Sequence, residues 1–69
     1  MDTLRISLAA ARVNADMTQT DVSKALKVSN KTVLSWEKGK TSPSYATLKA
    51  LSDLYKVPID NIRLPGELT

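Results

Sequence analysis

Apolar residues recur at helical spacing along this chain, and polar residues that start or stop helices divide it into short segments. The first segment predicts a helix that ends near Asn14 and has one face lined by Leu4, Leu8 and Ala11. Asp2 or Thr3 is expected to cap its start. No stretch sustains the alternation of apolar and polar residues that indicates a β-strand. The pattern therefore predicts an all-α fold.

Two helix starts lie close together in the centre of the chain. Thr18 and Asp21 form a capping signal. The second helix that they begin ends near Leu26 and is expected to place Val22, Ala25 and Leu26 in the core. Ser29 is expected to cap a third helix that runs to about Lys38, turns Val33 and Trp36 inward and stops at Gly39. Two short helices joined by a turn of about three residues form a helix-turn-helix.

The rest of the chain predicts one long helix and a closing turn. Residues 41–44 have the composition of a loop and a helix cap. A fourth helix follows, with Tyr45 near its start and Leu48, Leu51 and Tyr55 on one face. Residues 57–62 are expected to form one further helical turn. The predicted fold is a compact all-α bundle of four helices plus a short fifth, with residues 1–63 as a single domain and 64–69 as a tail.

Length and composition exclude several classes of protein. A chain of 69 residues supports one small core. The absence of Cys and His removes disulfides, the usual zinc sites and the commonest general base. No apolar run approaches the roughly 18 residues that span a bilayer. We therefore expect a cytoplasmic protein that is not an enzyme and needs no cofactor and no metal.

The positive charge is concentrated in one segment. Residues 24–40 contain one acidic residue, Glu37, and carry a net charge of +4, so the whole excess that gives the chain its net charge of +3 lies there. Their basic residues are Lys24, Lys27, Lys31, Lys38 and Lys40. Such a patch suits a polyanion, although charge alone leaves open a merely solvated face.

The third helix has an outward face that suits a DNA groove. Once Val33 and Trp36 point into the core, the residues left outside are Ser29, Asn30, Lys31, Leu34, Ser35 and Lys38. In the major groove, an asparagine amide can pair with adenine and a leucine can touch a thymine methyl group. Lys31 can reach guanine or a phosphate. These residues are the candidate DNA-binding surface.

Four short motifs occur in order: Thr18-Gln19, then V-S-x-x-T-V at 28–33, W-E-K-G-K at 36–40 and P-S-x-x-T-L at 43–48. In order and spacing they resemble the Cro/C1-type helix-turn-helix family, also described as xenobiotic-response-element or phage lambda repressor-like. The resemblance covers roughly residues 4–62. It implies a five-helix domain that binds double-stranded operator DNA, usually as a two-fold homodimer.

The resemblance also implies roles for individual residues. The positions that match the family's base-reading residues are Ser29, Asn30, Lys31 and Ser35. Gln19 matches a residue that contacts phosphate and buttresses a base-reading side chain. The loop that holds the DNA backbone corresponds to Lys38, Lys40 and Ser42. Arg12 and Glu37 match an ion pair between the first and third helices, whose arginine also faces a phosphate.

The chain departs from the family pattern at Ser23, where the family favours alanine, and at Lys27, where it favours glycine. If φ is positive at Lys27, the lysine costs about 1 kcal/mol. The leading hypothesis is a small bacterial or prophage repressor that places residues 30–38 in the major groove, with no small-molecule ligand. The alternatives are the DNA-binding half of a toxin–antitoxin pair and a scaffold for protein contacts. A dimer surface is expected among Leu54, Ile59, Ile62, Leu64 and Leu68.

Overall fold

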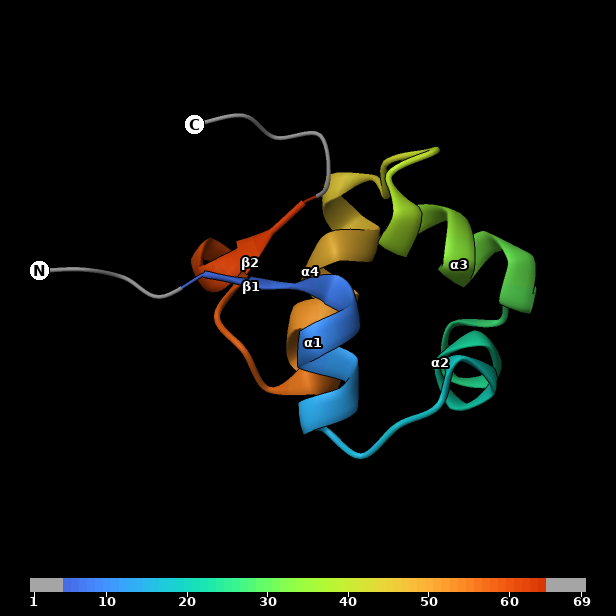
Figure 1. Cartoon of the computed structure of the whole chain (residues 1–69), viewed down its shortest axis with the longest axis horizontal. Helices are drawn as coiled ribbons and strands as arrows, with labels where there is room; N and C mark the ends of the chain where they lie inside the picture. The colour runs from blue at the N-terminus through green and yellow to red at the C-terminus, as the bar shows by residue number, and fades with distance from the viewer. Residues whose placement is uncertain (1–4, 65–69) are drawn as a thin grey trace, which may run out of the picture.

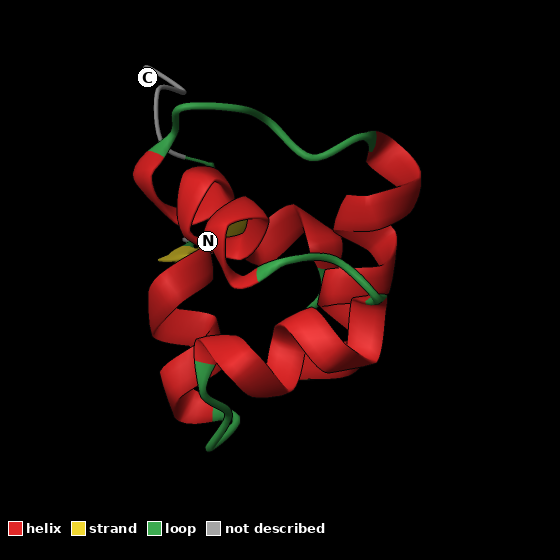
Figure 2. Ribbon diagram, turned by 90° about the vertical axis from the view of Figure 1, so that its right-hand side faces the viewer, coloured by secondary structure: helices red, strands yellow, loops and turns green. Residues whose placement is uncertain are grey.

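The computed structural model describes residues 5–64. In chain order, its elements are β1 (Ile6–Ser7), α1 (Leu8–Asn14), α2 (Gln19–Leu26), α3 (Asn30–Lys38), α4 (Tyr45–Tyr55), the 3-10 helix η1 (Ile59–Asn61) and β2 (Ile62–Arg63). Figure 1 shows α2 and α3 at the end of the molecule opposite the two strands. Helices make up nearly all of the regular structure (Figure 2). The predicted bundle of four helices is confirmed, and η1 is its short fifth helix.

A two-residue strand at each end of the described chain was not predicted. Strands β1 and β2 pair in parallel, with Ile6 opposite Ile62 and Ser7 opposite Arg63. A pair this short contains no repeat of apolar and polar residues, so it left no periodic signal in the sequence. It is a minor element, but it ties the start of the helical bundle to the chain after η1.

Helix α1 begins later than the sequence predicted. Its N-cap is Ser7, whose hydroxyl accepts a hydrogen bond from the Ala10 N–H at 3.1 Å. Residues Ile6 and Ser7 are extended, so the prediction of one continuous helix from Leu4 to Ala11 is wrong at its start. Asp2, Thr3 and Leu4 themselves lie outside the described residues. Ile6 and Ser7 pair with β2 in an extended conformation, so they cannot also form the first turn of α1.

The other helix starts lie where the sequence predicted them. The hydroxyls of Thr18, Ser29 and Ser44 each accept the backbone N–H three residues later, at 3.0 to 3.2 Å. At Thr18 the cap is reciprocal, because the Asp21 carboxylate accepts the Thr18 N–H at 2.9 Å. Side-chain caps of this kind satisfy N–H groups that have no partner within the helix.

The core lies between α1, α4 and the helix-turn-helix. Its buried apolar residues are Leu8, Ala11, Val22, Val33, Trp36, Leu51, Tyr55 and Ile62. The prediction that Ala25 points inward is wrong: Ala25 is exposed, and Ser23 is buried instead. The Ser23 hydroxyl donates to the Thr20 carbonyl at 2.8 Å, so a polar side chain is accommodated inside without an unpaired group.

The C-terminal part of the domain contributes to the same core. Ile62 is 3% exposed and Leu64 packs against the buried cluster. Ile62 therefore cannot belong to the dimer surface that the sequence suggested, because its side chain is used within the protomer. Leu68 and residues 65–69 of the predicted tail lie outside the described residues. Within 5–64, no helix is long and apolar enough to cross a membrane.

Candidate nucleic-acid interface

Helices α2 and α3 are joined by a turn of three residues, 27–29, and form the predicted helix-turn-helix. Lys27 ends α2 in the left-handed conformation, with φ at 60°. The chain then turns back, and the Val28 N–H donates to the Ser23 carbonyl at 2.9 Å. Ser29 caps α3 directly afterwards. These local bonds set the angle at which α3 leaves α2.

Helix α3 has a buried face and an exposed face. Val33 and Trp36 are 1% and 8% exposed and belong to the core. The exposed residues of the helix are Asn30, Lys31, Leu34 and Lys38, while Ser35 is half-buried. Ser29, at the cap, is exposed as well. The structure thus gathers the candidate base-reading side chains on the outer side of α3, with Ser35 the least accessible.

The segment after α3 presents the predicted backbone-binding residues. Gly39 has φ at 81°, a conformation that glycine adopts without the steric cost of a Cβ. The Lys40 N–H then donates to the Ser35 carbonyl at 3.0 Å, which holds the loop against the last turn of the helix. Lys38, Lys40 and Ser42 are all exposed. Two lysines and a hydroxyl therefore lie together beside the end of α3.

Arg12 and Glu37 form the predicted ion pair between α1 and α3. Arg12 Nε donates to Glu37 Oε2 at 2.8 Å, and Nη2 donates to Oε1 at 3.4 Å. The two side chains are 15% and 7% exposed. Arg12 Nη1 also donates to the Met17 carbonyl at 2.9 Å. Hydrogen bonding to Glu37 raises the pKa of Arg12, so its guanidinium stays charged.

Gln19 joins the same network from the first residue of α2. Its Nε2 donates to Glu37 Oε1 at 3.0 Å, so Glu37 ties α1, α2 and α3 together. The buried Tyr55 of α4 lies close enough to sense both charges. Burial, reinforced by Glu37 and opposed by Arg12, raises the pKa of the Tyr55 hydroxyl to about 12, and the phenol stays neutral. In this arrangement the Gln19 amide faces Glu37, and the Arg12 guanidinium is held by Glu37 and the Met17 carbonyl.

Asn30 makes a contact that the sequence did not predict. Its Nδ2 donates to the hydroxyl of Thr20, the second residue of α2, at 3.0 Å. Both side chains are exposed. Nothing in the sequence indicated this role for Thr20, because a threonine in the first turn of a helix has no distinctive signal. Its relation to Asn30, ten residues away, arises only when α2 and α3 are packed together.

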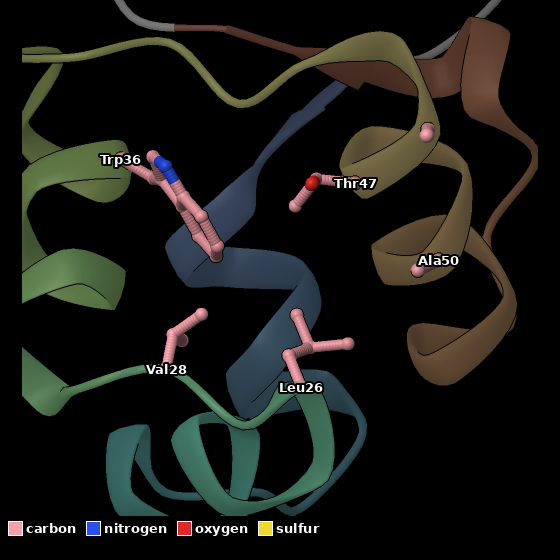
Figure 3. A pocket seen from close by; sticks show the side chains of 6 residues that line it. Leu26, Val28, Trp36, Thr47 and Ala50 are labelled. Carbon is pink, nitrogen blue, oxygen red and sulfur yellow. The ribbon is translucent and has the colours of Figure 1, made fainter.

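A separate hollow of about 260 Å³ lies behind the helix-turn-helix, between it and α4. Figure 3 shows the side chains of Leu26, Val28 and Trp36 facing Thr47 and Ala50 across it, and Ala46 completes the lining. None of the six side chains is charged, so the hollow lacks the positive charge of the segment around α3. It is not part of the candidate DNA surface.

The fold defines a class of protein, the helix-turn-helix DNA-binding domain. A family model for the helix-turn-helix matches residues 8–62. The chain therefore belongs to the Cro/C1-type helix-turn-helix family, as the motifs predicted, and is a DNA-binding regulator. No curated protein and no solved structure gives a significant match. Among residues 5–64, no three His, Cys, Asp or Glu side chains are grouped to hold a metal ion.

Proposed function

We propose that this protein is a small bacterial or prophage repressor that recognises an operator by inserting α3 into the major groove. The observation that supports this most directly is the exposed side of α3 described above, with Asn30 and Lys31 in its first turn. Residues at the start of a recognition helix point at base edges, whereas those at its end lie over the backbone. Bound at a promoter, the protein would block transcription. It would act in the bacterial cytoplasm.

The charges of this surface support contacts with phosphates that flank the bases read by α3. Lys38 is the last residue of α3, and Lys40 and Ser42 follow in the exposed loop. Their ammonium and hydroxyl groups are suited to phosphate oxygens. The Arg12–Glu37–Gln19 network holds the start of α2 against α3, so the flanking contacts and the base contacts keep a constant spacing.

We infer further that the protein binds as a homodimer, at least on DNA. One recognition helix reads about half a turn of groove, and two half-sites about 34–36 Å apart supply the missing specificity. A surface that suits the contact contains Tyr45, which is 72% exposed, and the half-buried Ile59 and Leu64 beside it. Sedimentation with a full operator is expected to show two protomers per duplex. One protomer at saturating protein would contradict the dimer.

The experiment that tests the proposed function is selection of binding sites from a random duplex library with the full chain. An enriched inverted repeat is expected, because a two-fold dimer presents two copies of α3 to the DNA. Retention on unselected DNA without an enriched sequence would contradict sequence-specific regulation. Failure to bind any duplex at low salt would favour a scaffold for protein contacts instead. Enrichment only with a co-purified partner would point to an antitoxin.

A further inference from the structure

The first turns of α2 and α3 are joined at their outer surface by a hydrogen bond between Asn30 and Thr20. Asn30 Nδ2 and Thr20 Oγ1 are 3.0 Å apart. Asn30 is the first residue of α3 and Thr20 the second of α2. Both are exposed, and Asn30 belongs to the candidate DNA-binding surface, so the bond lies on the side of the molecule that the proposed function turns toward DNA. It ties the amide of a candidate base-reading residue to the first turn of α2.

The hydroxyl of Thr20 is not needed to start its own helix. Thr18 and Asp21 form the capping box of α2. The Ser23 hydroxyl donates to the backbone carbonyl of Thr20 at 2.8 Å, so this bond does not involve the Thr20 side chain. Within residues 5–64, the bond from Asn30 is the hydrogen bond that the Thr20 hydroxyl makes. Its position is therefore tied to Asn30 rather than to the stability of α2.

The orientation of the amide decides which base it can read. An asparagine amide has two hydrogens on nitrogen and one acceptor oxygen. Thr20 takes one hydrogen, so the other hydrogen and Oδ1 remain available to a ligand. Adenine presents the matching pair in the major groove, since its N7 accepts and its N6 donates. If the amide turned over, its oxygen would face Thr20 and the pair of groups offered to the base would change.

We propose that Thr20 is a positioning residue that fixes the Asn30 amide for bidentate recognition of adenine, and so sets the base preferred at one operator position. This inference rests on the proposed function, because it assigns a role within the same DNA-binding surface. It makes the contact between α2 and α3 a determinant of sequence specificity rather than of stability alone.

The test uses the operator obtained by selection, with the adenine pair opposite Asn30 replaced by each other base pair. Thr20→Val removes the hydroxyl and keeps the branched shape, whereas Thr20→Ser keeps the hydroxyl. Thr20→Val is expected to lower the preference for adenine about fivefold, which corresponds to a hydrogen bond of about 1 kcal/mol. Thr20→Ser is expected to retain the preference. Thermal unfolding of both variants checks that the fold is intact.

A second comparison separates positioning from a direct contact. In an Asn30→Ala background, Thr20→Val is expected to cause no further loss of preference, because the group that it positions is gone. An equal loss in both backgrounds, or an equal weakening on all four duplexes, would overturn the inference. If selection enriches no sequence at all, the proposed function fails first. If adenine is enriched and lost with Asn30→Ala but unaffected by Thr20→Val, only the role of Thr20 is wrong.

Discussion

Arg12 and Glu37 are joined across α1 and α3 by a hydrogen bond of 2.8 Å between Nε and Oε2, and both side chains are largely buried. Glu37 also accepts from Gln19, and Arg12 also donates to the Met17 carbonyl. Removing one partner of a buried charge pair costs the protein much more stability than removing both, because the remaining charge is left buried and unpaired. The pair is thus the centre of a three-helix junction.

Replacing Arg12 and Glu37 together is expected to destabilise the protein less than the sum of the two single replacements. Arg12→Met and Glu37→Leu are each expected to cost about 2–4 kcal/mol in the free energy of unfolding. The double variant should fall short of the sum by about 1–3 kcal/mol. Urea unfolding of the four proteins measures this coupling. Losses that simply add would show that the two side chains act independently. The i,i+4 pair Lys49–Asp53, exposed on α4, serves as a control with little coupling.

The capping box of α2 is expected to make stability depend on acid. Hydrogen bonding by Thr18, chiefly from its backbone N–H, lowers the pKa of Asp21 below its ordinary value. A carboxyl with a lowered folded pKa contributes stability above its unfolded pKa, about 3.9, and loses it as the pH falls through the folded pKa. Asp21→Asn should therefore lower Tm at pH 7, and the gap to the parent protein should close toward pH 2.

The control for this experiment is Asp53→Asn, which removes a carboxylate of equal charge from the exposed pair on α4. It separates the local cap from the change in net charge. A Tm gap for Asp21→Asn that stays constant from pH 7 to the acid range would show that the carboxylate charge does not contribute to the cap.

Lys27 occupies a position where glycine is expected to be more stable. Its φ of 60° places a Cβ in the left-handed region, which costs roughly 1–2 kcal/mol for an ordinary residue. The greater flexibility of glycine in the unfolded chain offsets part of that gain. Lys27→Gly is therefore expected to raise the free energy of unfolding by about 0.5–1 kcal/mol. Lys24→Gly, inside α2, removes the same charge and should cost about 1 kcal/mol. Chemical denaturation that finds both variants destabilised would contradict this account.

Asn30 and Lys40 are expected to affect DNA binding in different ways. Asn30→Ala should cost about 1–3 kcal/mol on the operator and little on scrambled DNA, because a base contact is lost. Lys40→Ala should weaken both duplexes similarly and lower the log–log salt slope by about one, because a phosphate contact is lost. Titrations of each variant at several salt concentrations distinguish the two. If Asn30→Ala weakened both duplexes equally and Lys40→Ala changed the preferred sequence, α3 would dock differently from the proposal.

The sequence by itself determined where α2, α3 and α4 begin and where α3 ends. Thr18, Ser29 and Ser44 cap helices through bonds to residues three positions away, and Gly39 ends α3 through its own backbone angle. Interactions this local are present in any conformation that forms the helix, so the residue types predict them. The family motifs added the Arg12–Glu37 pair, which the geometry confirms.

Only the tertiary structure decided the relations between residues on different elements. Ile6 pairs with Ile62, which is nearly the whole chain away in sequence. Because residues 6 and 7 are extended in this pairing, α1 begins only at Leu8. The partner of Asn30 depends on how α2 crosses α3, because the two side chains meet only after both helices bury their apolar faces. The same packing buries Ser23 and leaves Ala25 exposed. Such contacts depend on positions and angles in space, which no spacing along the sequence specifies.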